Sequence, residues 1–141
     1  MVVGIIGESC TGKSTLAEKL KAQLNAEVYT GKDYLRLAKN EAIAKKLFVK
    51  RLEAAVSGES IIYVISEKEH LALLPEGAVR ILMTADLALI EERFAQRMRG
   101  VLPQPVKTML ERKHDLFDKE RYNYHIHNGE SADEVCAALC K

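Results

Sequence analysis

The sequence predicts an α/β fold of three layers (α/β/α), in which helices cover both faces of a five-stranded parallel sheet. Short apolar, β-branched runs alternate with amphipathic helical stretches along all 141 residues. A glycine-rich turn, GESCTGKS, joins the first apolar run to the first helical stretch. No internal repeat or low-complexity stretch divides the chain, so residues 1–141 are expected to form a single domain.

The first half of the chain predicts three of the strands. The run VVGII before the glycine-rich turn is β-branched and suits a buried parallel strand. After the turn, apolar residues recur at helical spacing, namely Leu16, Ala17, Leu20 and Leu24. The expected elements that follow are a short strand at 26–31, helical segments at 33–40 and 41–56, and a strand at 61–66.

The second half predicts two further strands, each followed by a helix. Ser66 and Glu69 have the spacing of a capping box, which should start a short helix that Pro75 and Gly77 end. The remaining expected elements are a strand at 78–85, an amphipathic helix at 86–99, a helix with Pro105 in its first turn, a strand at 123–128, and a last helix opened by Ser131 and Glu134.

The turn at 7–14 has the pattern Gly-x-x-x-x-Gly-Lys-Ser of a phosphate-binding loop, or P-loop. Its two glycines permit backbone angles and a close approach that a Cβ would forbid, so amide groups can turn toward phosphate oxygens. Lys13 can reach terminal phosphates, and the Ser14 hydroxyl can ligate a bridging magnesium ion. The order strand, loop, helix favours this interpretation over a glycine-rich turn without a ligand. The expected nucleotide contacts are Gly7, Glu8, Ser9, Cys10, Thr11, Gly12, Lys13, Ser14 and Thr15.

Charge and cysteine usage narrow the function classes. The chain has 21 basic and 20 acidic residues and a net charge of +1, which gives no reason to expect a nucleic-acid or membrane surface. The N-terminal apolar run is too short for a membrane span and lacks a basic leader. Cys136 and Cys140 are spaced for shared helix packing rather than for a metal, which fits a reducing, cytoplasmic location.

Across nearly its whole length the sequence resembles the small P-loop nucleotide kinases, the adenylate, cytidylate and guanylate kinase group. The resemblance implies a strand order of 2-3-1-4-5 and the use of ATP with Mg²⁺. One of the stretches that carry it is YTGKDYLR, which resembles an acceptor-binding segment of adenylate kinases with Lys32 as an extra residue. There Thr30, Asp33 and Arg36 would bind the acceptor, with Arg36 matched to a phosphate and Asp33 to a hydroxyl or acting as a base. The alternative is that Asp33 only caps a helix and Arg36 is solvated.

The stretch ERFAQRMRG places Arg93 and Arg97 four residues apart, on one helix face. An arginine pair with this spacing begins the lid of adenylate kinases, and the resemblance implies that both contact the nucleotide and take part in catalysis. Positive charge on developing phosphate oxygens is what phosphoryl transfer requires. Arg112 resembles a further arginine of the family after the lid. A solvated face paired with Glu91 and Glu92 is the alternative.

The stretch YNYHIHNGES resembles the last strand of guanylate and cytidylate kinases, whose Asn-containing turn lies beside the donor base. Asn128 would take that place. His125 and His127 alternate on one strand face and could be a metal pair or a base. Since no carboxylate or cysteine accompanies them at ligand spacing, packing or solvent exposure is favoured.

The sequence departs from the family in three places. The third strand ends in Ser66 where these kinases often have an acid that supports magnesium, and Glu67 is the candidate replacement. The acceptor-side segment at about 31–57 is short, and the lid at about 97–107 is reduced to a helical turn. Exclusion of water could therefore be completed by a second subunit, so either a monomer or a homodimer is expected.

Together these features predict an ATP-dependent small-molecule phosphotransferase of the nucleotide or nucleoside kinase type. Its partner would be a small-molecule acceptor, with no nucleic acid and no membrane. Two alternatives remain. The acceptor could be another metabolite, as in the shikimate and gluconate kinases, or the protein could be a non-catalytic ATP-binding regulatory module.

Overall fold

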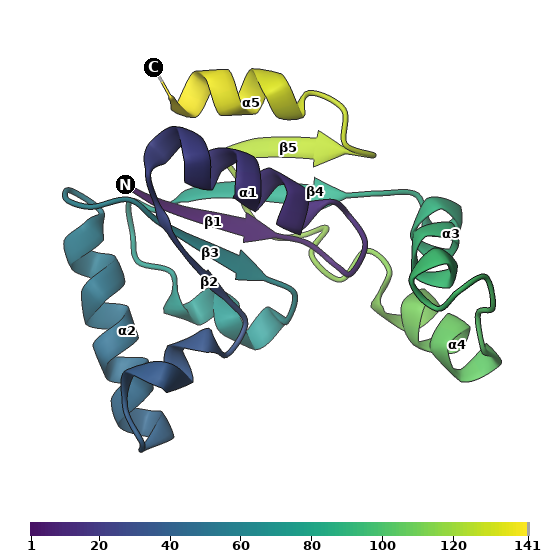
Figure 1. The fold of residues 1–141 in the computed structure, drawn as a ribbon, viewed down its shortest axis with the longest axis horizontal. Helices are drawn as coiled ribbons and strands as arrows, with labels where there is room; N and C mark the ends of the chain where they lie inside the picture. Colours follow the sequence, from purple (N-terminus) through teal and green to yellow (C-terminus); the bar gives the residue numbers. More distant parts are fainter. Residues whose placement is uncertain (141) are drawn as a thin grey trace.

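The computed structural model describes residues 1–140, which form a five-stranded sheet in the order β2-β3-β1-β4-β5 with all neighbouring strands parallel (Figure 1). The predicted three-layer α/β/α fold and strand order are confirmed. The strands are β1 (Val2–Ile6), β2 (Glu27–Thr30), β3 (Ile61–Ile65), β4 (Val79–Thr84) and β5 (Tyr124–His127). The helices are α1 (Lys13–Leu24), α2 (Glu41–Ala55), α3 (Leu87–Arg97), α4 (Gln104–Lys113) and α5 (Ala132–Leu139), with short 3-10 helices η1 (Asp33–Leu37) and η2 (Lys68–Leu73).

Buried apolar clusters on the two faces of the sheet hold the layers together. Alternation along β1 sends Val3 and Ile5 to the cluster beneath α1 and α5, and Val2 and Ile6 to the opposite cluster. The opposite cluster is covered by α2, η1 and η2 and contains three tyrosine rings packed around Phe48. All residues of β1 are buried, as expected for a strand between two parallel neighbours.

A third, smaller cluster joins α3 and α4 to the P-loop beyond the carboxyl ends of the strands. Ile90 of α3, Leu110 of α4 and Cys10 of the loop are buried together there. Figure 1 shows both helices beyond the arrowheads of the sheet. This packing positions the basic end of α3 beside the P-loop.

Helix starts and ends differ from the sequence expectations. The capping boxes at Ser66 and Ser131 do not form: η2 has Glu67 at its N-cap, Ser131 adopts a left-handed backbone, and neither helix has a side-chain cap. The segment expected to be helical over 33–40 is only the 3-10 helix η1. α3 ends at Arg97 rather than Arg99, because Arg99 and Gly100 adopt positive φ and turn the chain toward α4.

Candidate active site

The P-loop runs from the end of β1 to the start of α1 and requires glycine at both fixed positions. A Cβ on Gly7 would collide with the carbonyl oxygen of Met83 and lie 2.8 Å from the Thr11 hydroxyl. Gly12 has φ of 95°, in the region that side chains disfavour. The loop is therefore held close against β4, with its amide-rich turn before the N-terminus of α1, as an anion-binding turn requires.

Lys13 lies buried within the loop, and its ammonium donates to the carbonyl oxygen of Glu8 at 2.6 Å. The Thr11 hydroxyl donates to the same oxygen at 2.9 Å. Burial, with a further contribution from the nearby Arg97 charge, lowers the pKa of Lys13 to about 8, against opposing contributions from Cys10 and Glu8. A phosphate placed beside this ammonium would raise its pKa again and compensate for the burial.

Two adjacent cavities share the P-loop. The large cavity, of about 600 Å³, includes Thr15, Lys19, Met83, Arg93, Arg97 and Gly129 in its lining. The small cavity, of about 150 Å³, includes Lys13, Ser14, Thr30, Ser66 and Arg97. Arg97 and several loop residues line both, so the two cavities meet at the place where a terminal phosphate would lie.

The two predicted lid arginines have different surroundings. Arg93 donates to the carbonyl oxygen of Cys10 at 2.9 Å and so anchors α3 to the P-loop. Arg97 lies at the exposed end of α3, and within residues 1–140 no carboxylate comes within ion-pair distance of it. The ion pairs with Glu91 and Glu92 that formed the alternative are absent from these described residues. Arg97 is thus the arginine whose charge is available to a phosphate.

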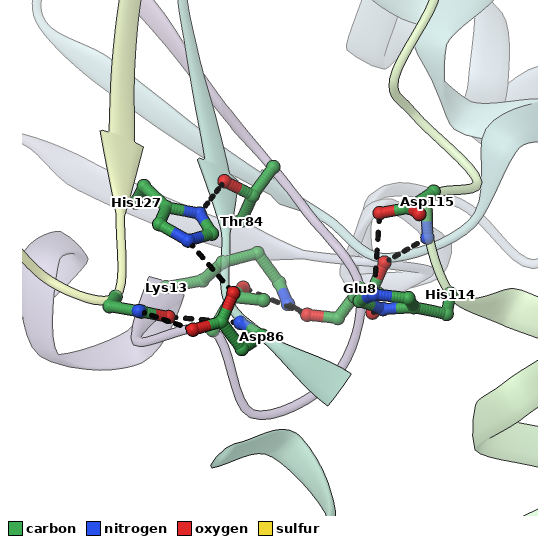
Figure 2. A network of polar contacts seen from close by, with 9 residues as sticks. Glu8, Lys13, Thr84, Asp86, His114, Asp115 and His127 are labelled. Carbon is green, nitrogen blue, oxygen red and sulfur yellow. Dashed lines mark hydrogen bonds and ion pairs between the residues drawn. The ribbon is translucent and has the colours of Figure 1, made fainter. Parts of the chain in front are cut away.

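Sequence reasoning missed a close polar contact between the P-loop and the segment after α4. Figure 2 shows the Glu8 carboxylate bound by the segment after α4: His114 Nδ1 lies 2.7 Å from one oxygen, and the Asp115 amide donates to the other at 2.9 Å. Asp115 presents this amide from a backbone with φ of 62°. The contact links residues 106 positions apart, so no local pattern could have identified it. This contact connects the segment after α4 to the P-loop, and the Arg93 hydrogen bond connects α3 to the same loop.

The Glu8–His114 contact should make stability depend on pH. Burial lowers the pKa of His114, but the hydrogen bond to Glu8 and the charges of Glu8, Asp115 and Asp118 outweigh it, and the pKa is raised overall. Because the pKa of His114 is higher in the folded state than in the unfolded state, the contact contributes its full stabilisation below the ordinary histidine pKa. This contribution is lost as pH rises through the folded-state pKa.

We therefore expect His114→Asn, which keeps a donor near the Nδ1 position but removes the charge, to lower the unfolding free energy by about 1 kcal/mol at pH 6. The deficit should shrink toward zero at pH well above the His114 pKa. Denaturant unfolding of the original protein and of His114→Asn from pH 6 upward measures this deficit. The titration of other groups affects both proteins equally and cancels in the difference. Glu8→Gln should remove the pH dependence as well. A deficit that is constant with pH would contradict a charged contact.

The predicted acceptor residues do not all face the small cavity. Thr30 lines it, and the Asp33 carboxylate accepts from the Thr30 amide at 2.9 Å, so Asp33 is held next to a lining residue without lining the cavity itself. Arg36 points elsewhere: its guanidinium pairs with Glu27 at 3.2 Å and stacks 4.3 Å from the centre of the Tyr29 ring. Since Glu27 begins β2, Arg36 is directed toward the opposite end of that strand.

The other predicted side chains lie outside the two cavities. Glu67 pairs with Lys113 of α4 at 3.5 Å. Arg112 is exposed in the last turn of α4. Asn128 accepts from the Asp86 amide at 2.9 Å and donates to the Asp86 carboxylate at 3.0 Å, so the next residue, Gly129, lines the large cavity instead.

The two histidines of β5 belong to the same local network as Asp86. His125 Nε2 lies 2.7 Å from the Thr84 hydroxyl. Figure 2 shows the other two contacts: His127 Nδ1 lies 2.7 Å from the same hydroxyl, and His127 Nε2 lies 3.2 Å from Asp86. Hydrogen bonds from Asn128 and His127 lower the pKa of Asp86. The network joins the ends of β4 and β5 and fixes the turn that forms one wall of the large cavity.

The groups around Ser14 fit a magnesium ion held mainly by phosphate and water. Ser14 is exposed and lines the small cavity, and the Ser66 hydroxyl lies on the same cavity. Among the described residues that line this cavity there is no carboxylate. Magnesium binds oxygen ligands and usually keeps several waters, so a hydroxyl with phosphate oxygens and water is an adequate set. Ser14 is the protein ligand that this arrangement favours.

A P-loop at the carboxyl edge of a 2-3-1-4-5 parallel sheet, with arginines on the helix after β4 lying over the loop, defines the fold class of the small P-loop kinases. No protein-family model matches the chain, and no curated protein matches it in sequence. None of the helices in residues 1–140 is long and apolar enough to cross a membrane.

Solved structures resemble the chain over nearly its whole length. An uncharacterized protein from Eubacterium ventriosum has 18% identity and a TM-score of 0.69, covering 99% of this chain and 98% of its own. A shikimate kinase from Acinetobacter baumannii, solved with shikimate, has 12% identity and a TM-score of 0.64, covering 98% and 92%. A gluconokinase from Sinorhizobium meliloti has 13% identity and a TM-score of 0.62, covering 99% and 93%. The chain therefore has the fold of the small P-loop kinases.

Proposed function

We propose that this protein is an ATP-dependent small-molecule kinase. The observation that carries the proposal is the small cavity, where Lys13, Ser14 and Arg97 of the donor side lie with Thr30 and Ser66 of the acceptor side. A bare nucleotide-binding module would also use Lys13 and Ser14, but the small cavity extends beyond the P-loop to Thr30 and Ser66. This extension lets an acceptor hydroxyl approach the terminal-phosphate position, which favours transfer over binding alone.

The donor side is assigned to the P-loop and α3. Loop amides of Gly7–Thr15 and the Lys13 ammonium would hold the phosphates, and Arg93 would leave the Cys10 carbonyl to join Arg97 on them. Magnesium on Ser14 would neutralise charge on the β- and γ-phosphate oxygens. The large cavity, with Gly129 and Met83 in its walls, is wide enough for the nucleoside part of ATP.

The acceptor side is assigned to the small cavity and its margin. An acceptor hydroxyl oxygen would attack the γ-phosphorus in line, the bond between the γ-phosphorus and the bridging oxygen would break, and ADP would leave. Asp33, held by the Thr30 amide, would orient the hydroxyl and take its proton. Arg36 would help bind a phosphorylated acceptor only by leaving Glu27 and Tyr29, so the geometry favours an acceptor that offers a hydroxyl without a phosphate.

An acceptor screen tests the proposal. Mg-ATP is incubated with panels of nucleosides, nucleoside monophosphates, sugars and hydroxy acids, and ADP formation is measured against an acceptor-free control. We expect a nucleoside or a hydroxylated metabolite to be phosphorylated faster than any nucleoside monophosphate. Tight ATP binding by calorimetry with no ADP formation in any panel would instead support a regulatory ATP-binding module.

The remaining proposals concern the protein's location, its partners and three further residues. Cys10, Cys136 and Cys140 are free thiols, which supports a reducing, cytoplasmic location. We propose a monomer or homodimer that acts on a small molecule, without nucleic acid or membrane as a partner. Arg112, Asn128 and Glu67 keep proposed roles in acceptor, donor-base and magnesium binding. For these roles Asn128 would have to leave Asp86, and Glu67 would have to leave Lys113.

A further inference from the structure

A second substantial cavity, of about 520 Å³, lies at the opposite edge of the sheet from the P-loop. It is formed where β4 and β5 begin, by the segment that precedes each strand. Because the P-loop follows the carboxyl end of the parallel strand β1, the length of a strand separates the two sites, about 20 Å for the six residues of β4. We call it the far-edge cavity, and the proposed kinase mechanism makes no use of it.

Two arginines, Arg80 and Arg121, line the far-edge cavity without a carboxylate partner. Within residues 1–140 neither guanidinium comes within ion-pair distance of an acid. Partial burial of Arg80, and then the charge of Arg121, lower the pKa of Arg80. The two like charges are thus close enough to repel each other, and among the described residues neither has a carboxylate within ion-pair distance.

The nearby acids offset this charge only in part. Glu120 is close enough to act against the lowering of the Arg80 pKa, but its carboxylate pairs with Lys68 at 3.7 Å rather than with either arginine. Glu76 is exposed at the cavity rim, where it contributes one negative charge against the two guanidiniums. The cavity therefore keeps a net positive lining with a single carboxylate available to accept hydrogen bonds.

The cavity walls are held in place before any ligand arrives. The Asn123 side chain accepts from the Arg80 amide at 2.8 Å, and the Asn123 amide donates to the Arg80 carbonyl at 2.8 Å. Tyr122 is 49% exposed, and its ring packs 5.3 Å from the centre of the His125 ring. A fixed aromatic ring beside two forked cationic donors is a suitable surface for a phosphorylated, ring-containing molecule.

We propose that the far-edge cavity binds a small phosphate-bearing metabolite with sugar-like hydroxyls. The phosphate lies on Arg80 and Arg121, the sugar ring lies against Tyr122, and the Glu76 carboxylate accepts from hydroxyls. Its volume is within the range of small-ligand pockets, and guanidinium forks match phosphate oxygens geometrically. The site is independent of the proposed kinase reaction.

Ribose 5-phosphate is the probe, and backbone amide shifts of the full chain by nitrogen-15 NMR are the readout. We expect saturable shifts at Gly77 and Tyr122 at concentrations up to about 10 mM, weaker shifts with inorganic phosphate, and none there with ribose. Site-resolved shifts separate this binding from phosphate bound at the P-loop. Arg121→Gln, at an exposed position, should weaken binding about tenfold, from the loss of one charged hydrogen-bond donor set.

Lys119→Gln is the matched control, because Lys119 is exposed, two residues away, and outside the cavity lining. It should leave the affinity within about twofold, since distant surface charge is screened. Shifts confined to the P-loop, or an equal loss in Lys119→Gln, would overturn the site. Inorganic phosphate binding as tightly as ribose 5-phosphate would overturn the assignment of a hydroxylated ligand.

Discussion

Replacing Lys13 with methionine is expected to reduce phosphoryl transfer by at least about a thousandfold while the fold is retained. The Lys13 ammonium is buried beside the Glu8 carbonyl and is the one loop side chain that can place a full positive charge against the terminal phosphates. Methionine fills similar volume without the charge. Turnover is measured by ADP release with the acceptor found in the screen, and folding by circular dichroism.

The same substitution should not destabilise the protein at neutral pH. Burial holds the pKa of Lys13 at about 8, below the 10.5 of an unfolded chain, so the folded state binds fewer protons between these values. The contribution of Lys13 to stability is therefore present above about pH 10.5 and lost as pH falls through about 8. We expect Lys13→Met to raise the unfolding free energy by about 1 to 2 kcal/mol at pH 7, with the gain disappearing toward pH 10.

Lys21→Met is the control, since Lys21 lies exposed in the last turn of α1 and lines neither P-loop cavity. It should leave turnover and the pH profile of stability nearly unchanged. A Lys13→Met protein that keeps turnover within tenfold of the original would contradict the assignment of the loop as the donor site, because Lys13 is the only cationic side chain of the loop, and Arg97 belongs to α3.

The fold and the geometry of the P-loop could be predicted because their signals are local. The β-branched run before Gly7 and the helical spacing after Lys13 each lie within a few residues, and the parallel sheet follows from their alternation. The P-loop glycines are fixed by backbone geometry: φ at Gly12 and the closeness of Met83 to Gly7 leave no room for another residue. Such constraints can be derived from a short stretch of sequence.

The contacts that position the site could not be predicted because they depend on competition among distant partners. Arg36 has the right place in the sequence to bind an acceptor phosphate, yet Glu27 and the Tyr29 ring offer it a closer partner on β2. His114 contacts Glu8 although 106 positions of sequence separate them. The expected capping box at Ser66 failed for a similar reason, since the chain at the end of β3 turns to line the small cavity instead.

Replacing Arg97 with methionine is expected to lower kcat about a hundredfold with a smaller change in KM for ATP. Arg97 lines both cavities at their junction, so its charge would act on the phosphoryl group during transfer more than on the bound donor. Arg97 also lowers the pKa of Lys13 through space, so its removal should raise that pKa. Steady-state kinetics measure the first effect, and NMR titration of the Lys13 ammonium in the unliganded protein measures the second.

Arg99→Asn is the matched control, because Arg99 is exposed two residues further on, lines neither cavity, and has a left-handed backbone that asparagine tolerates. It removes the same charge from the same turn and should leave both kcat and the Lys13 pKa nearly unchanged. An equal loss of kcat in both variants would indicate that general positive charge near the turn matters rather than the position of Arg97. A raised Lys13 pKa with unchanged kcat would show that Arg97 neighbours the phosphate site without acting on the transferred group.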